Sequence, residues 1–139
     1  MKILIIRFSS IGDIVLTTPI IRCIKQQLPN IELHYVTKAA YRSVIANNPY
    51  IDQCHFFEQH VEDVIPTLKE AKFDLVIDLH KNLRSLKVKK ALNLKSLSFQ
   101  KLNISKWLLV KLFNVLKISN YHERTFIKLV TRKEANLND

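Results

Sequence analysis

The sequence predicts an α/β fold, a doubly wound, Rossmann-like domain with a mostly parallel sheet. Three observations predict it. Residues 3–6 are a run of isoleucine and leucine, typical of a strand that is buried on both faces of a parallel sheet. Residues 73–79 contain a second such run. Segments with apolar residues every three or four positions alternate with these strands, and this alternation is typical of parallel α/β sheets.

The first strand leads through a polar turn into a long helix. The residues from Phe8 to Gly12 break the apolar run, and from Asp13 onward apolar residues recur at helical spacing up to Leu28. Pro29 disfavours a helical conformation of the residue before it, so the helix is expected to end there. The chain therefore opens with strand, polar turn and helix.

The next elements follow from the same patterns. We expect a strand over residues 31–37, a short helix over 38–46, a strand over 51–58 and a helix over 61–71. Pro66 is awkward in the last of these, because proline cannot donate the helical hydrogen bond. After the strand over 73–79, we expect a helix over 83–92 and a fifth strand over 95–100.

The end of the chain is predicted to be helical and then polar. An amphipathic helix is expected over residues 104–116, and its apolar side packs on the core or lies on an anionic bilayer. A last helix is expected over residues 121–130. The polar residues 131–139 are typical of a linker. We therefore expect one domain over residues 1–130 and the start of an interdomain linker over 131–139.

Length and composition fit a cytosolic domain. The 139 residues are 47% hydrophobic, which is too apolar for a disordered chain and enough for a sizeable core. Arg7 and Asp13 interrupt the richest apolar stretch, so we expect no membrane span and no signal peptide. Cys23 and Cys54 are expected to be free, buried thiols. Without a spaced histidine pair they make no zinc site.

The positive charge lies in the second part of the chain. Of the formal net charge of +10, residues 1–79 contribute −1 and residues 80–139 contribute +11. From Lys81 to Lys117 there are ten lysines or arginines and no acidic residue. This surface either attracts anions such as phosphate, carboxylate, acidic lipid or nucleic acid, or is a solvated face without a partner.

The loop after the first strand contains Gly12, the only glycine in the chain. We expect this residue to let the backbone turn, or approach a ligand where a side chain would clash. A Walker phosphate loop and a dinucleotide fingerprint each need at least two glycines at fixed spacing, so neither is present. Ser9, Ser10 and Asp13 lie with it where open α/β sheets collect ligands, beyond the carboxyl end of a strand.

This loop and a second junction resemble a known family. Residues 7–19, Arg-Phe-Ser-Ser-Ile-Gly-Asp-Ile-Val-Leu-Thr-Thr-Pro, are similar to the N-terminal signature of glycosyltransferase family 9, the heptosyltransferases of lipopolysaccharide core assembly. Residues 74–80 and 82–85 are similar to the second conserved junction of that family. Lys81 departs from the pattern, because family members often have glycine there.

The resemblance implies a fold and an activity. It implies the N-terminal, acceptor-side half of a GT-B type glycosyltransferase, in which two Rossmann-like domains face each other across the active site. The C-terminal domain that grips the nucleotide-sugar, expected to be an ADP-sugar, would be absent, so this chain alone is expected to be inactive. An inverting transfer of heptose or a similar sugar to the lipopolysaccharide inner core, without cofactor or metal, is implied.

The implied acceptor is an anionic lipid-linked saccharide. It would place the protein in the cytoplasm, in peripheral contact with the inner membrane. The basic stretch that begins at Lys81 suits both a carboxylated or phosphorylated acceptor and the anionic leaflet in which it sits. No nucleic-acid partner is expected on this interpretation.

Asp13 is the candidate catalytic residue. Transfer of a sugar to a hydroxyl needs a base that accepts the hydroxyl proton, and the resemblance implies that Asp13 is that base. The alternative is an acidic residue in the first helical turn, which offsets the helix dipole by roughly 0.3–1 kcal/mol. Both roles are compatible, because helix N–H groups would keep the carboxylate ionised.

The other candidates are expected to bind substrate: Ser9, Ser10, Gly12, His80, Asn82 and Arg84. Ser9 and Ser10 either cap the helix or border the acceptor and the incoming donor. Arg84 either pairs with an acceptor carboxylate or phosphate through its planar guanidinium or faces solvent. Asp78 is expected to cap a helix or end the sheet rather than act in catalysis.

The residues bear on two other classes of function. A basic module that binds nucleic acid or another polyanion without catalysis is the alternative, although Phe99, Trp107 and Phe113 follow strand or helix periodicity rather than form a stacking platform. A receiver-type signalling domain needs acidic residues at the end of the first strand, to hold magnesium. Arg7-Phe8-Ser9 stands there instead.

Overall fold

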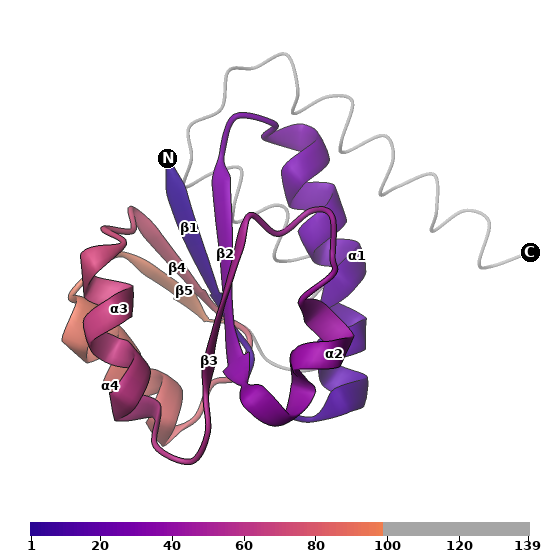
Figure 1. Cartoon of the computed structure of the whole chain (residues 1–139). Helices are drawn as coiled ribbons and strands as arrows, with labels where there is room; N and C mark the ends of the chain where they lie inside the picture. Colours follow the sequence, from indigo (N-terminus) through magenta and orange to yellow (C-terminus); the bar gives the residue numbers. More distant parts are fainter. Residues whose placement is uncertain (99–139) are drawn as a thin grey trace, which may run out of the picture. The chain divides into compact units, whose positions relative to one another are not determined.

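The sheet is arranged around its first strand. In the computed structural model, which describes residues 1–98, five strands lie in the order β3-β2-β1-β4-β5 and every neighbouring pair is parallel. The strands are β1 (Lys2–Ile6), β2 (Glu32–Lys38), β3 (Gln53–Phe57), β4 (Leu75–Asp78) and β5 (Ser96–Ser98). β1 therefore pairs with β2 on one side and with β4 on the other (Figure 1).

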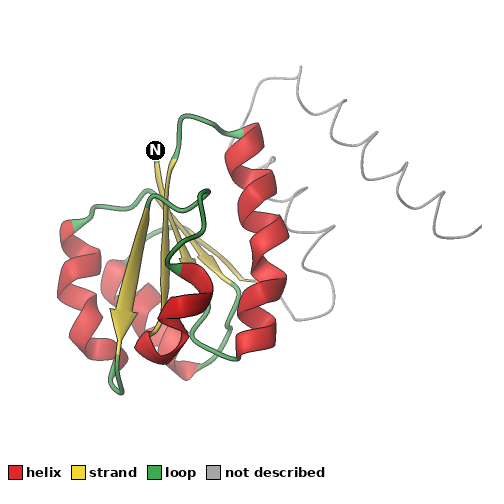
Figure 2. Ribbon diagram, turned by 45° about the vertical axis from the view of Figure 1, so that its right-hand side comes forward, coloured by secondary structure: helices red, strands yellow, loops and turns green. Residues whose placement is uncertain are grey.

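Helices cover both faces of the sheet. They are α1 (Ile11–Gln27), α2 (Arg42–Ile45), α3 (Ile65–Glu70) and α4 (Leu83–Leu92), with 3-10 turns η1 (Ala39–Tyr41) and η2 (Val61–Val64). Figures 1 and 2 show α1 and α2 on one side of the sheet and α3 and α4 on the other. The doubly wound, Rossmann-like α/β fold predicted from the sequence is thereby confirmed.

The cover on both faces explains why the central strands are apolar. Residues 3–6 of β1 have no solvent exposure. Leu4 and Ile6 pack with Val76 of β4, and Leu68 of α3 and Val88 of α4 belong to the same buried cluster. Burial of these side chains is the main favourable term in forming the fold.

Two helices differ from their expected bounds for identifiable reasons. The helix expected over residues 61–71 is divided into η2 and α3, and Pro66 stands in the first turn of α3. Proline is well tolerated there, because the first N–H groups of a helix have no helical partner in any case. α1 begins at Ile11, so Gly12 lies inside its first turn.

The expected turning role of Gly12 is wrong. Within residues 1–98 no glycine has a positive φ, and a Cβ added at Gly12 would have no atom within 4 Å. The residue therefore adopts an ordinary helical backbone at an exposed position. Its alternative role, a close approach to a ligand, stays a prediction.

Three further expectations concern thiols, metals and membranes. Cys23 and Cys54 are free, but both are half-buried rather than buried. Among residues 1–98 no group of three or more histidine, cysteine or acidic side chains is placed to hold a metal ion. In the same range, no helix is both long enough and apolar enough to cross a bilayer.

Several expectations lie outside the described residues. They are the end of the fifth strand at 99–100, the helices over 104–116 and 121–130, the linker over 131–139, and the part of the basic stretch from residue 99 onward. The domain boundary at residue 130 stays a prediction for the same reason.

A histidine pair lies buried in the core near Phe73. His34 of β2 and His55 of β3 are joined by a 2.8 Å hydrogen bond between Nδ1 and Nε2. His34 also bonds Glu32 through Nε2, at 2.7 Å, and its ring meets that of Phe73 edge-on at 5.0 Å. Burial, helped by the neighbouring His34, lowers the pKa of His55 from its ordinary 6.5 to about 4.

This pair predicts a loss of stability in mild acid. Between pH 6.5 and 4, unfolded His55 binds a proton that folded His55 does not, so the free energy of unfolding falls as the pH falls. The contribution is up to about 3 kcal/mol for a shift of this size. Urea unfolding at pH 7, 5.5 and 4.5 measures it. His55→Gln is expected to flatten the dependence relative to the wild-type chain, whereas the exposed His60→Gln is expected to keep it. Equal slopes for His55→Gln and the wild-type chain would show that His55 does not carry the effect.

Candidate active site

The two polar junctions predicted from the sequence lie side by side. β1 and β4 are adjacent and parallel, so the chain leaves both strands at the same edge of the sheet. The Phe8 ring, which follows β1, lies 4.9 Å from the His80 ring, which follows β4. Phe8 is fully buried, and its ring also packs edge-on against Phe57, with 5.0 Å between the ring centroids. Phe8 is therefore an apolar contact between the two junctions and the core.

Arg7 joins the two junctions and was not among the predicted site residues. Its side chain is only 4% exposed, although it carries a charge. One terminal nitrogen donates to the Leu79 carbonyl at 2.5 Å, and the other pairs with the Asp13 carboxylate. The signal in the sequence was a charged residue directly after a buried strand. A buried charge has to be paired, and here one partner lies in the first turn of α1 and the other in the loop after β4, both at the carboxyl edge of the sheet.

Asp13 sits in the first turn of α1 with its carboxylate partly exposed, at 25% of the side-chain surface. The Ser10 hydroxyl donates to Asp13 Oδ2 at 3.1 Å, and the Ser10 N–H donates to the same oxygen at 3.4 Å. Arg7 pairs with this oxygen as well. The carboxylate is therefore held in place by a main-chain donor, a hydroxyl and a cation, and still meets solvent.

These contacts keep Asp13 ionised. Its partial burial acts to raise the pKa of the carboxyl group, but the two hydrogen bonds from Ser10 and the charge of Arg7 outweigh burial and leave the pKa below its ordinary value. The group is therefore an anion throughout the neutral range. It can accept a proton or a hydrogen bond from a hydroxyl group.

The two serines of the loop have different positions. Ser10 is the N-cap residue of α1, and capping this helix is one of the two roles expected for it. Ser9 precedes the cap and is half-buried, so it does not cap the helix. The peptide bond between them is cis. Whether either serine contacts a substrate stays a prediction.

Asp78 organises the second junction. It is fully buried, and its Oδ1 accepts the N–H groups of His80 and Lys81 at 3.0 and 2.8 Å. Its Oδ2 accepts the Ser85 hydroxyl at 2.8 Å and pairs with Lys89 at 2.9 Å. All of these contacts fix the loop and the start of α4, which agrees with the structural role expected for Asp78.

Lys81 adopts the backbone conformation that glycine prefers. Its φ is 51°, in the left-handed region, which costs a residue with a side chain roughly 1–2 kcal/mol. The N–H of Lys81 donates to Asp78, and this bond offsets part of that cost. The loop therefore keeps a glycine-like turn, although this chain has a lysine at the position.

His80 is half-buried and neutral at pH 7. Burial lowers its pKa, the nearby charge of Arg7 lowers it further, and the carboxylates of Asp78 and Asp13 counteract this only in part. Among the described residues, its Nδ1 atom has no hydrogen-bond partner. His80 therefore does not add a positive charge to the site.

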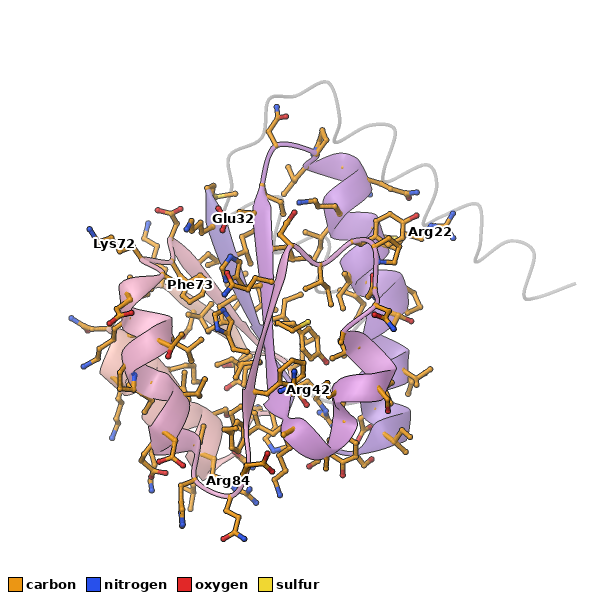
Figure 3. The ribbon with its side chains drawn as sticks, in the orientation of Figure 1. Arg22, Glu32, Arg42, Lys72, Phe73 and Arg84 are labelled. Atoms are coloured by element: carbon orange, nitrogen blue, oxygen red, sulfur yellow. The ribbon has the colours of Figure 1, made fainter. Side chains whose placement is uncertain are left out.

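Asn82 and Arg84 differ in the environment of their side chains. The Asn82 side chain caps α4 by accepting the Ser85 N–H at 3.0 Å, so the fold already accounts for this residue. Arg84 is exposed in the first turn of α4 and lies beyond the carboxyl ends of the strands (Figure 3). It adds an exposed cation at the edge of the sheet where Asp13 lies.

The chain is similar to a curated protein. No family model matches the sequence. The sequence is 26% identical over 144 residues to lipopolysaccharide heptosyltransferase 1 of Campylobacter coli, and the match covers 99% of this chain and 42% of that protein. The chain therefore spans less than half the length of the relative. The resemblance to glycosyltransferase family 9 stated from the motifs is confirmed.

Solved structures show the same fold. A family 9 glycosyl transferase from Veillonella parvula has a TM-score of 0.65 at 22% identity, over 70% of this chain and 31% of that chain. The ADP-heptose lipopolysaccharide heptosyltransferase II of E. coli has a TM-score of 0.62 at 20% identity, over 70% and 30% of the two chains. The fold of residues 1–98 is therefore one that these glycosyltransferases contain.

The Asp78 contacts predict a large loss of stability on truncation. Asp78→Ala removes the partner of Lys89 and leaves two loop N–H groups unbonded, so the free energy of unfolding is expected to fall by about 3 kcal/mol. Urea unfolding at pH 7 measures this, with the exposed Asp63→Ala as the matched control, expected to change it by less than about 0.5 kcal/mol. Similar effects of the two variants would refute the structural role of Asp78.

Proposed function

We propose that this chain is the acceptor-side domain of an inverting glycosyltransferase that transfers heptose, or a similar sugar, from a nucleotide-sugar to the lipopolysaccharide inner core. The observation that carries the proposal is the Asp13 carboxylate, which is ionised, partly exposed and held at the carboxyl edge of β1. The similarity to heptosyltransferases supports the sugar and the acceptor class.

In this reaction an acceptor hydroxyl attacks the anomeric carbon of the donor. The new C–O bond forms as the bond to the nucleotide diphosphate breaks on the opposite face, so the anomeric centre is inverted. The hydroxyl proton passes to Asp13. Although Asp13 is a weak base, the hydroxyl becomes more acidic as its oxygen bonds to carbon, and the transfer is favourable in the transition state.

The second junction supplies cationic and neutral donors for an anionic acceptor. Arg84 and Lys81 are exposed beside His80, and an arginine binds a carboxylate or phosphate through two parallel hydrogen bonds. We assign the donor, an ADP-sugar, mainly to a second domain outside this chain, since one relative is named for ADP-heptose. The assignment needs no cofactor and no metal.

Acceptor binding is therefore expected without turnover. When the nitrogen-15-labelled chain is titrated with a delipidated, phosphorylated inner-core saccharide, the amide signals of Ser10, Asp13 and His80 are expected to shift. Arg84→Gln is expected to weaken binding about tenfold, the loss of one good charge-assisted contact. The control Arg22→Gln removes an exposed arginine of α1 that lies away from this edge, and it is expected to leave affinity unchanged (Figure 3).

Two results would contradict this assignment. Shifts confined to residues far from the carboxyl edge, or equal losses for Arg84→Gln and Arg22→Gln, would remove the acceptor site. Formation of heptosylated product by the purified 139-residue chain with ADP-heptose would show that the chain is not a half of the catalytic unit. Binding of generic duplex DNA with a steep salt dependence would favour the alternative, a polyanion-binding module.

We also propose that the protein is cytoplasmic and meets the inner membrane through α4. Leu83, Leu86, Lys87 and Lys90 stand at helical positions i, i+3, i+4 and i+7, so they share the outer face of this helix. Leu83 is 79% exposed and Leu86 is 40% exposed. An anionic leaflet, the expected location of the acceptor, attracts the lysines and accepts the leucines at its surface.

Vesicle sedimentation tests this contact. The chain is expected to bind phosphatidylcholine vesicles that contain phosphatidylglycerol, and to bind vesicles of phosphatidylcholine alone far less. The double variant Leu83→Ser, Leu86→Ser is expected to lose at least half of the bound fraction, since each leucine contributes apolar surface. Leu16→Ser removes a leucine of α1 that is 70% exposed and is the control. Unchanged binding of the double variant would exclude α4 as the contact.

A further inference from the structure

The proposed reaction gives no role to Arg7, although this residue lies in the candidate site. Its side chain is buried, it carries a charge, and it stands between the two junctions of the candidate site. We propose that Arg7 is a positioning residue: it holds the Asp13 carboxylate at the carboxyl edge of β1 and ties that position to the β4–α4 junction through the Leu79 carbonyl. This inference rests on the proposed role of Asp13 as the base.

The sheet fixes the position of the main chain from which the Arg7 side chain extends. The Arg7 N–H donates to the Val36 carbonyl of β2 at 3.2 Å, and the Leu79 N–H donates to the Ile6 carbonyl at 3.0 Å. The main chain therefore enters and leaves this region in a defined register with both neighbouring strands. The side chain of Arg7 reaches from this register to Asp13 in the first turn of α1.

The geometry suits the forked guanidinium group of an arginine. The two terminal nitrogens point to different acceptors, a carboxylate on α1 and a main-chain carbonyl after β4. Among the described residues, Nε has no hydrogen-bond partner, so the terminal nitrogens make the contacts. A lysine carries the same charge, but its single nitrogen lacks the planar fork that reaches two acceptors in fixed directions.

A purely stabilising ion pair is a weaker account of these contacts. Asp13 is partly exposed, and pairs that involve a solvated partner add little net stability, while burying a guanidinium costs several kcal/mol. The burial of the guanidinium group is explained if the ion pair holds the Asp13 carboxylate in one position. Ser10 bonds the same oxygen, so cation, hydroxyl and main-chain donor converge on Asp13 Oδ2.

The pairing also has a consequence for the proton. When Asp13 accepts the proton of the acceptor hydroxyl, Arg7 temporarily loses its anionic partner in a buried place. The proton is then released from Asp13 to water, and the ion pair forms again. The base is thereby reset for the next acceptor without a change in the positions of the loops.

Carbon-13 NMR of the aspartate carboxyl groups tests the proposal on the intact 139-residue chain. In Arg7→Gln the pKa of Asp13 is expected to rise by about one unit, because the neighbouring charge is lost. In Arg7→Lys the charge remains, so the pKa is expected to rise much less. The Asp13 χ1 angle, measured by three-bond couplings, is expected to occupy one rotamer in the wild-type chain and to average over rotamers in both variants.

A matched control uses another ion pair of α1. Lys25 Nζ lies 2.5 Å from Asp52 Oδ2, so Lys25→Gln is expected to raise the pKa of Asp52 and to leave the pKa and the rotamer of Asp13 unchanged. If Arg7→Gln does not fold, Asp13→Asn provides the same test from the other side. The side-chain N–H protons of Arg7 are then expected to exchange with water faster than in the wild-type chain.

The outcomes separate this inference from the proposed function. An Asp13 pKa and rotamer that do not change in Arg7→Gln, or Arg7 exchange rates that do not change in Asp13→Asn, would refute the positioning role, whether or not the acceptor binds. A confirmed positioning role together with an acceptor that does not bind would instead leave Arg7 as stated and remove the proposed reaction.

Discussion

The candidate site depends on one buried cation. A guanidinium group that is withdrawn from water needs acceptors, and those of Arg7 are the Asp13 carboxylate in the first turn of α1 and the Leu79 carbonyl after β4. These contacts join two segments that are distant in sequence. The position of Asp13 is thus set by the electrostatic requirement of a strand residue, and the first turn of α1 by itself would leave its side chain free to rotate.

The topology of the sheet makes this arrangement possible. β1 and β4 are separated by more than sixty residues in the chain, but they are neighbours in the sheet and end at the same edge. The apolar residues of β1 are buried on both faces, so its register with β2 and β4 cannot slip without exposing them. The packing of the core therefore determines the relative positions of Arg7, Asp13 and the loop that Asp78 organises.

The loop after β4 shows how local strain is tolerated at such a site. Lys81 occupies a left-handed conformation, and Asp78 compensates by accepting N–H groups of the loop and the hydroxyl of Ser85. The result is a hydrogen-bonded turn that places the His80 ring against Phe8 of the first junction. A charged residue in place of glycine also adds a cation to an edge where the proposed substrate is an anion.

Much of the fold could be predicted from local patterns, and the site could be predicted in part. The apolar runs of β1 and β4 and the bounds of α4 follow directly from periodicity. The role of Gly12 was wrong, because the helix begins before it, at the Ser10 cap. Arg7 was missed, because its partner Leu79 is close only in the folded sheet.

The most direct test of the account is a crystal structure of this chain at neutral pH, with the electron density of two side chains as the readout. We predict that the Arg7 guanidinium contacts both the Asp13 carboxylate and the Leu79 carbonyl, with the carboxylate facing solvent at the edge of the sheet. An Asp13 side chain packed beneath its neighbours, or an Arg7 side chain turned out into water, would contradict it.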